Sequence, residues 1–471
     1  MTLRLAVMVT LAAAAAAACS LAPAYRTPDS APATAAYGAL SEWQLAAPAA
    51  VLPRGAWWQI YGNSTLDSLE ERIGHGNQDL QAALARLQQA RAGTRIARSG
   101  YFPTVTANSY GARSRTSQNS PRFPKTAEAV SNDFDLEADL SYQLDLFGRV
   151  RSTANAARAT QQASASDLAT LQLTLQAELA RDYFGLQAAD AQQSLLDRTV
   201  AAYDKALQLT KNLYAGGAAA QGDVDQAQAQ LEGARTLSAD ARLQRAQLEH
   251  AIAILVGANP SAFHLDVDRL AATVTPPVID AGLPSTLLER RPDIAAAERR
   301  VAAANAAIGI ARAAYFPVFT LTGSAGDNSV QSAQLFSAPS RLWSLGASGA
   351  LTLFDAGLHR AQSAQAHAAF DEQVADYRKA VLTAYGEVED SLVALRELER
   401  ESASEAAAVQ ASSRALDQAQ HLYEAGATTY LQVVVAENTA LQSQLSASNI
   451  QLRRLAASVA LVKALGGGWQ G

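Results

Sequence analysis

Cysteine is almost absent from this chain. Cys19 is the only cysteine among 471 residues, so an internal disulfide is excluded. It follows an N-terminal stretch in which Arg4 precedes an apolar run over 5–18. That run is too short to span a bilayer as a helix, but a basic residue, a short apolar core and small residues before a processing point are typical of a secretory signal. We therefore predict a cleaved signal peptide over 1–18.

The residues around the cysteine are typical of a lipid-modification site. Ala16, Ala17 and Ala18 before Cys19 resemble the lipobox of bacterial lipoproteins. The resemblance implies that Cys19 becomes the N-terminus and carries a diacylglycerol and an N-acyl chain; no other cofactor is expected. Ser20 lacks the aspartate that retains such lipoproteins at the inner membrane, which implies the outer membrane of a Gram-negative bacterium. An ordinary signal peptide with an incidental cysteine is the alternative.

Strong charge, long apolar runs and catalytic motifs are also missing. The chain has 38 Lys and Arg against 44 Asp and Glu, and this mildly acidic balance argues against a nucleic-acid partner. After the signal, no run approaches the roughly 18 apolar residues of a transmembrane helix. The six histidines are scattered, and no HExxH, GxSxG, P-loop or CxxC motif occurs. We therefore expect no catalytic residue, no metal site and no enzymatic activity, and a lipid-anchored hydrolase has no supporting motif.

A strand pattern is the clearest feature that is present. In NDFDLEADLSYQLDLFG, residues 132–148, the even positions from Phe134 to Leu146 are apolar, and the odd positions from Asp133 to Asp145 are polar. A period of two indicates a β-strand with one apolar and one polar face. A soluble sandwich would turn the polar face outward to water. A membrane barrel would instead turn the apolar face to lipid and line a water-filled lumen with the polar face.

The sequence also contains an internal repeat. ARSGYFP at 97–103 recurs as ARAAYFP at 311–317, and LYAGG at 213–217 resembles LYEAG at 422–426. The first pair lies 214 positions apart and the second 209, in the same order along the chain. Self-similarity of this kind is typical of a duplicated structural unit. We therefore predict two repeats of one fold.

Each repeat is expected to contain a helix, two strands and a long helical hairpin. YFP ends the first helix at its proline, and Gly-rich turns near 215–222 and 425–428 join the long helices. Valines recurring every seven residues from Val374 to Val388 indicate a coiled-coil-like seam. The predicted organisation begins with a signal peptide over 1–18 and an extended lipid-anchored segment over 19–62. A first repeat follows over 63–256, with strands at about 103–116 and 132–147. An equatorial linker over 257–284 then leads to a second repeat over 285–471, with strands at about 317–326 and 342–354.

Four strands cannot close a barrel alone, and an open sheet edge is not tolerated in hydrocarbon. Copies of the chain must therefore pool their strands. Two copies would give eight strands and a barrel filled by side chains, whereas three would give twelve and leave a conduit. In the barrel, Asp135, Glu137 and Asp139 are expected to line the lumen. A structural tether of the envelope, built on the long helices, is the alternative without a channel.

Two segments carry a specific resemblance. LLERRPDIAAAERRVAAANAAIGIARAAYFP (287–317) and WWQIYGNSTLDSLEERI (57–73) are similar to the TolC superfamily, in particular to the NodT-type outer-membrane efflux lipoproteins. The resemblance implies an α/β membrane protein: a homotrimer whose twelve-stranded barrel, with four strands per protomer, continues into a long α-helical periplasmic tunnel with a mixed equatorial belt.

The same resemblance implies a function. Such a channel is a passive, gated exit duct that receives drugs or other small toxic compounds from an inner-membrane RND pump and a periplasmic adaptor. A TolC-like duct for type I protein secretion or for heavy-metal efflux remains the alternative within the family. The outer-membrane lipids are the remaining partner that we expect.

The resemblance also assigns residues to a periplasmic gate at the two hairpin turns. Tyr423 matches a tyrosine that closes the mouth, and Leu431 matches a leucine that narrows the bore. Tyr214 and Asp223 are expected at the mouth in the first repeat. Gly217 and Gly426 are the turn glycines, because glycine tolerates positive φ.

Two positions depart from the family pattern. A salt-bridging aspartate of the family falls on Val435, and an arginine falls on Glu424, so the usual ion-pair latch is absent or rearranged. Asp223, Asp225, Glu424 and Glu437 could instead form an acidic mouth, although each could equally be a solvated charge at a helix end.

Overall fold

The structure is a computed structural model, and it describes residues 21–30, 38, 55–119, 129–270, 275–279 and 290–469. The predicted signal peptide and Cys19 lie outside the described residues. The chain divides into two compact units. The sheet unit comprises 1–29, 87–164 and 296–377, and the hairpin unit comprises 30–86, 165–295 and 378–471. Each unit is described by itself.

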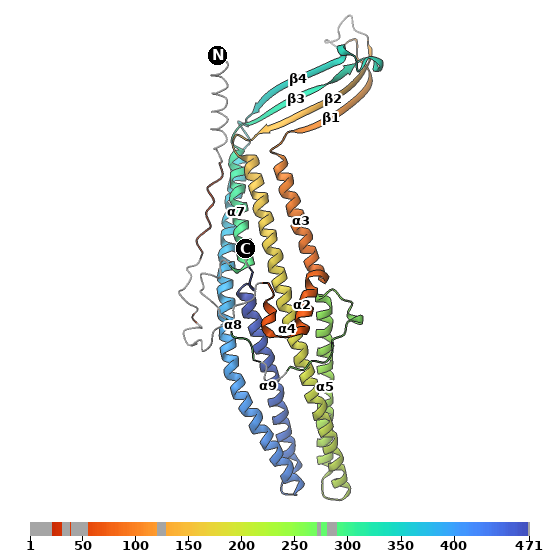
Figure 1. The fold of residues 1–471 in the computed structure, drawn as a ribbon, viewed down its shortest axis with the longest axis vertical. Coiled ribbons are helices and arrows are strands. Elements are labelled where there is room, and N and C mark those ends of the chain that lie inside the picture. The colour runs from red at the N-terminus through yellow and green to blue at the C-terminus, as the bar shows by residue number, and fades with distance from the viewer. Residues whose placement is uncertain are drawn as a thin grey trace. The chain divides into compact units, whose positions relative to one another are not determined.

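The sheet unit contains one four-stranded antiparallel sheet (Figure 1). Its strands are β1 (Thr104–Arg115), β2 (Val130–Leu144), β3 (Val318–Ser329) and β4 (Arg341–Ala350), in the order β1-β2-β3-β4. Each repeat supplies one hairpin, and the two hairpins join where β2 pairs with β3. Both β1 and β4 are edge strands of this sheet, so each carries a row of backbone groups that can pair with another strand.

The strand register keeps polar residues on one face across all four strands. Glu137 pairs with Asn108 on β1 and with Gly326 on β3, and Ser324 pairs with Ser344 on β4. The neighbouring positions place apolar side chains together on the opposite face, among them Val105, Leu136, Leu140, Leu321, Trp343 and Leu345. These six are all exposed in the single chain. The amphipathic alternation expected from the sequence is therefore confirmed.

Two strands end earlier than predicted. β2 stops at Leu144 and β4 at Ala350, whereas the sequence pattern continued to 147 and 354. Asp145 is the reason in the first repeat: its carboxylate accepts the backbone N–H groups of Val150 and Arg151, at 2.9 and 2.8 Å. These donors have no partner within a helix at its first turn. Asp145 therefore begins a helix instead of extending the polar face of the strand.

In the second repeat an aspartate also caps the long helix, but it stands at a different position of the repeat. The Asp355 carboxylate accepts the backbone N–H groups of Gly357 and His359, both at 2.9 Å. Since a carboxylate near a helix N-terminus also interacts favourably with the helix dipole, this aspartate fixes the start of the long helix that follows.

The helices of the two repeats have matching lengths. α4 (Arg149–Ala215) and α8 (Leu358–Glu424) each have 67 residues. α5 (Gln221–Leu255) and α9 (Tyr430–Ala464) each have 35, and α3 (Gln78–Ser99) and α7 (Pro292–Ala313) each have 22. The predicted duplication is therefore present in the fold. None of the described helices holds a stretch long and apolar enough to cross a membrane.

The shorter elements of the described ranges are one α-helix and four 3-10 helices. They are η2 (Trp57–Tyr61), α2 (Ser64–Gly76), η3 (Pro260–Ala262), η5 (Ser332–Gln334) and η6 (Ala338–Ser340). In the hairpin unit, η2 and α2 are held by buried apolar side chains, among which Trp57, Leu66 and Ile73 are at most 1% exposed. Burial of side chains this large is the main term that stabilises the position of α2.

An early segment of the sheet unit is bound to α7. Asn305 donates to the carbonyl of Pro23 at 2.9 Å, and the hydroxyl of Tyr25 donates to the Glu298 carboxylate. Gly309 allows Ala22 to approach closely, because a Cβ at Gly309 would lie only 2.6 Å from the Ala22 Cβ. Residues 22–25 are thus held along the helix that leads into β3.

In both repeats, a side-chain N–H group binds a backbone carbonyl at the end of the second helix of the long hairpin. In the first, the Asn77 amide donates to the carbonyl of Leu255 at 2.9 Å. In the second, the Arg291 guanidinium donates to the carbonyl of Ala464 at 3.1 Å. These donors lie 214 positions apart and the acceptors 209, which are the offsets of the sequence repeat. Each contact ties the end of a hairpin to the helix that begins the repeat.

Glycines permit the same contact. Gly257 and Gly466, which follow α5 and α9, have φ of +71° and +89°. A Cβ on Gly257 would lie 2.1 Å from the carbonyl oxygen of Gly76, and one on Gly466 would lie 2.0 Å from that of Arg290. Only glycine combines this left-handed conformation with so close a backbone approach.

Candidate gate and channel wall

The two hairpin turns lie at the same end of the hairpin unit (Figure 1), and they share one backbone geometry. Gly217 and Gly426 have φ of +75° and +72°. Ala218 donates to the carbonyl of Leu213, and Ala427 to that of Leu422, both at 2.8 Å. This is the Schellman pattern, which satisfies the last carbonyls of a helix and requires a left-handed residue. The two turn glycines therefore have the left-handed conformation, with positive φ, that the sequence predicted for them.

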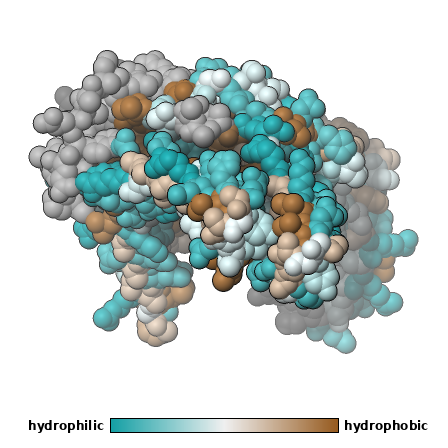
Figure 2. Space-filling model, turned by 90° about the horizontal axis from the view of Figure 1, so that it is seen from below, coloured by the Kyte–Doolittle hydropathy of each residue, from teal (hydrophilic) through white to brown (hydrophobic). Residues whose placement is uncertain are grey.

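The predicted gate residues differ in their surroundings. Tyr214 and Leu431 are exposed, at 47% and 59%. Tyr423 is half-buried, and its ring packs against that of Tyr430 with 5.4 Å between the centroids. Asp223 accepts the backbone N–H of Ala220 at 3.1 Å, which makes it a cap of α5. Figure 2 shows the face seen from below in Figure 1, where apolar and polar side chains lie beside one another.

Tyr423 belongs to a buried cluster that joins the two hairpins near their turns. We call it the tip cluster; its buried members are Tyr203, Leu207, Ala227, Leu231, Ala234, Tyr430, Val433 and Val434. They come from α4, α5 and α9, and Tyr423 of α8 packs against them. Sequence reasoning missed this cluster, because periodicity shows which side chains share a helix face and not which helix that face meets.

Glu437 was wrongly placed in an acidic mouth. It is 5% exposed, and burial raises the pKa of its carboxyl to about 7. Its charge acts on the tip cluster: after burial, Glu437 is the main cause that raises the pKa of the Tyr203 and Tyr430 hydroxyls. A solvated ring of four carboxylates is therefore not formed, because one member is enclosed between helices.

The two departures from the family pattern form no buried ion pair. Val435 is 54% exposed. Glu424 lies 3.9 Å from the ring of His421, and both side chains are mostly exposed. An exposed pair of this kind contributes little to stability. In the single chain the tip is therefore held by apolar packing rather than by an ion-pair latch.

The carboxylates expected in the lumen share one face of the sheet. Asn108 donates to Asp139 at 2.6 Å, and Asn328 donates to Asp135 at 3.3 Å. Glu137 lies between them in the register. Amide groups on both neighbouring strands thus donate hydrogen bonds to two of these carboxylates across the sheet.

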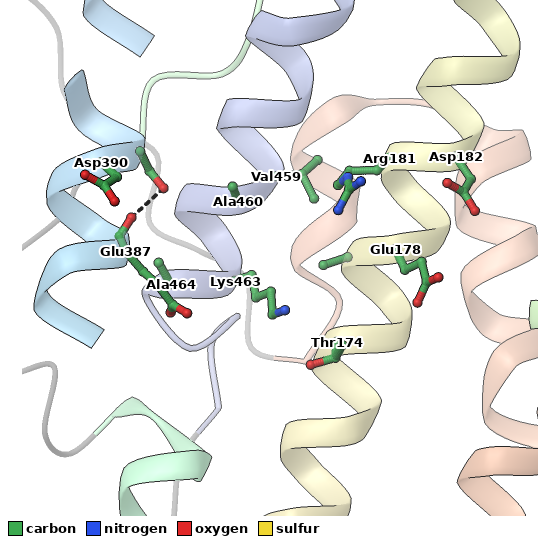
Figure 3. Close-up of a pocket in the computed structure, with 12 residues that line it drawn as sticks. Thr174, Glu178, Arg181, Asp182, Glu387, Asp390, Val459, Ala460, Lys463 and Ala464 are labelled. Carbon is green, nitrogen blue, oxygen red and sulfur yellow. Dashed lines mark hydrogen bonds between the residues drawn. The ribbon is translucent and has the colours of Figure 1, made fainter. Parts of the chain in front are cut away.

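An open cavity of about 540 Å³ lies in the hairpin unit between α4, α8 and α9 (Figure 3). Equivalent positions of the two repeats line it, such as Glu178 with Glu387 and Asp182 with Ser391. Burial raises the pKa of Asp182 to about 6, Glu178 adds to the rise, and Arg181 opposes it. Among the described residues, no group of three or more potential ligands is arranged to hold a metal ion.

A family model described as outer membrane efflux protein matches residues 71–258 and 283–467, which are the two repeats. The chain belongs to this family. It is 34% identical over 461 residues to the probable efflux pump outer membrane protein TtgC of Pseudomonas putida strain KT2440, covering 96% of this chain and 93% of the relative. The antibiotic efflux pump outer membrane protein ArpC of Pseudomonas putida gives the same identity and coverage.

A solved structure shares the whole fold. The outer-membrane channel OprN superposes with a TM-score of 0.86 at 32% identity, covering 96% of this chain and 100% of that one. The α/β fold class and the resemblance inferred from the sequence are therefore confirmed. As an outer membrane efflux protein, the chain is an outer-membrane channel component of a tripartite efflux system.

Proposed function

We propose that three copies of the chain form a continuous duct through the outer membrane. The amphipathic four-stranded sheet with two free edges supports this most strongly. Pairing β1 of one copy with β4 of the next closes the sheet, which hydrocarbon requires. The closed barrel turns Leu140 and Trp343 to lipid, and Asp135, Glu137 and Asp139 line a water-filled lumen.

The duct works with a periplasmic adaptor and an inner-membrane RND pump. It exports drugs or other small toxic compounds, a proposal supported by the similarity to an antibiotic efflux component. The channel performs no chemistry, and the pump supplies the energy. Tyr214, Asp223, Tyr423 and Leu431 form its periplasmic mouth.

The gate assignment predicts that Tyr423→Ala loosens the closed mouth. The ring of Tyr423 packs on Tyr430 and covers the tip cluster, so its removal weakens the packing between hairpins. We expect wild type to conduct weakly in planar bilayers, and the variant to conduct several-fold more and to admit large antibiotics in cells. Tyr423→Phe keeps the ring and should behave as wild type. A completely silent wild type would contradict the duct, and equal conductance of wild type and Tyr423→Ala would contradict the gate.

We also propose that acyl chains on Cys19 anchor the protein. Ala22 is held against Gly309, on the helix that leads into β3. Cys19 lies three residues before Ala22, so it can reach no further than about 11 Å from it. This short reach supports an anchor beside the barrel, at the membrane surface.

The anchor predicts that Cys19→Ser loses acylation and keeps the barrel. A serine cannot form the thioether to diacylglycerol, and the strands that would close the barrel begin more than 80 residues after this position. Metabolic labelling with radioactive palmitate should mark wild type and Ser20→Ala but not Cys19→Ser, and all three should form oligomers of equal size in detergent. Retained label on Cys19→Ser would refute the lipoprotein assignment.

A further inference from the structure

One carboxylate is enclosed between the two hairpins near their turns. Glu437 lies on α9, about two helical turns after Tyr430. Within the part of the chain that the structure describes, its Oε2 atom has no hydrogen-bond partner, and neither has the hydroxyl of Tyr203 on α4. A buried polar atom without a partner costs free energy that contact with water would recover. The packing at this point is therefore less favourable than in the rest of the tip cluster.

The surroundings of this carboxylate, as far as the structure describes them, contain no compensating positive charge. The groups that face it or its neighbours are Tyr203 from α4, Gln420 and Tyr423 from α8, Tyr430 on α9 and, acting on Tyr430, Asp223 from α5. Of these, only the Gln420 amide favours the ionised form. Within the described residues, no Lys, Arg or His forms an ion pair with Glu437. An ionised Glu437 is therefore strongly disfavoured while the hairpins remain packed.

The first repeat carries a neutral residue at the same place. The position equivalent to Glu437 is Gln228, which lies 209 residues earlier. Its amide donates to Glu232 at 2.7 Å within its own helix. The helix geometry of the repeat therefore accepts an uncharged side chain here, and the titratable group belongs to the second hairpin alone.

We propose that Glu437 is a protonation-controlled latch of the hairpin tip. When neutral, its carboxyl stays enclosed and the hairpins remain together. When ionised, it gains more from water than from the tip cluster, and α9 moves away from α4. The proposal rests on the gate assignment made above, and it adds a control by periplasmic pH.

The direction of the pH effect follows from the two states. Burial raises the pKa of Glu437 from its ordinary value near 4.5 to about 7 in the packed tip. Below about pH 4.5 both states hold the proton, so packing is most stable there. Between about 4.5 and 7 only the separated state releases it, so opening becomes more favourable by up to about tenfold per pH unit. Above pH 7 the effect levels off.

Planar-bilayer recordings of the full-length protein at pH 5 and pH 8 test the latch. Wild type should open at least tenfold more often at pH 8. Glu437→Gln should lose this dependence and remain near the wild-type level of pH 5, because its amide cannot ionise. Glu424→Gln removes an exposed acid from the same hairpin and should keep the wild-type profile. A pH response in Glu437→Gln equal to that of wild type would overturn the proposal.

A second measurement separates the latch from the channel. Spin labels at Lys211→Cys and Gln418→Cys, both exposed on α4 and α8, report the distance between hairpins in a Cys19→Ser background. The distance should increase from pH 5 to pH 8 with Glu437 present and stay constant with Glu437→Gln. A distance that does not change with pH in either protein contradicts the latch. A pH-dependent distance without conductance at any pH supports the latch and contradicts the duct.

Discussion

Replacing Gly257 by alanine is expected to destabilise the hairpin unit strongly. The left-handed backbone at this position costs an L-residue about 1–2 kcal/mol. The added Cβ would also lie 2.1 Å from the Gly76 carbonyl oxygen, and overfilling packed space costs typically about 1–3 kcal/mol more. A backbone atom cannot move aside as the end of a flexible side chain can. We therefore expect a loss of about 3 kcal/mol in the free energy of unfolding, seen as a lower denaturant midpoint in detergent by circular dichroism.

Gly217→Ala is the matched control. Gly217 has nearly the same φ, +75°, but nothing lies within 4 Å of its Cβ position. It should therefore lose only the conformational part, about 1 kcal/mol. The second repeat offers an independent copy of the comparison, with Gly466→Ala as the crowded variant and Gly426→Ala as the open one. Equal midpoints within each pair would contradict the close backbone contact.

Much of the fold could be predicted from the sequence. The period-two pattern and the repeated YFP and glycine turns were sufficient to predict four strands and two duplicated hairpins. The predicted ends of β2 and β4 were wrong. Asp145 fits the polar face of the strand pattern but bonds to a helix N-terminus, and Asp355, just beyond the predicted end of β4, does the same. A carboxylate in an alternating run does not indicate whether its partner is water or a backbone amide.

The site was predictable where backbone conformation decides the residue type. Gly217 and Gly426 are such positions, since a turn with positive φ selects glycine. Glu437 was not, because its burial depends on which neighbouring helix covers it. Asn77 and Arg291 were missed for another reason: they are equivalent in position and in the carbonyl they bind, but their side chains have no chemical likeness apart from an N–H donor.

Substitution of Arg291 should destabilise the hairpin unit strongly. Its guanidinium is 8% exposed and binds Asp293 and Glu387, both at 2.6 Å, as well as the Ala464 carbonyl. Burial opposes the charge, but the two carboxylates outweigh it and raise the pKa of Arg291, so it stays charged. Arg291→Met removes four hydrogen bonds that join α7, α8 and the end of α9.

Breaking a buried ion pair from one side costs about 3–5 kcal/mol when the remaining charge stays buried. Here the side chains of Asp293 and Glu387 are 33% and 45% exposed, so water can solvate both after the substitution. We therefore expect Arg291→Met to cost about 2–3 kcal/mol of unfolding free energy, at or just below the lower limit of that range. The measurement is the denaturant midpoint in detergent, as for the glycine variants.

Two further variants separate charge from geometry. Arg291→Lys keeps the positive charge but cannot bind a carboxylate through two parallel N–H groups, so its midpoint should fall between wild type and Arg291→Met. Arg290→Met changes the exposed neighbouring arginine and should leave the midpoint unchanged. If Arg291→Met unfolded at the same midpoint as Arg290→Met, the guanidinium would not stabilise the contact between the end of α9 and the start of α7. The close backbone approach at Gly466 would then have to stabilise it alone.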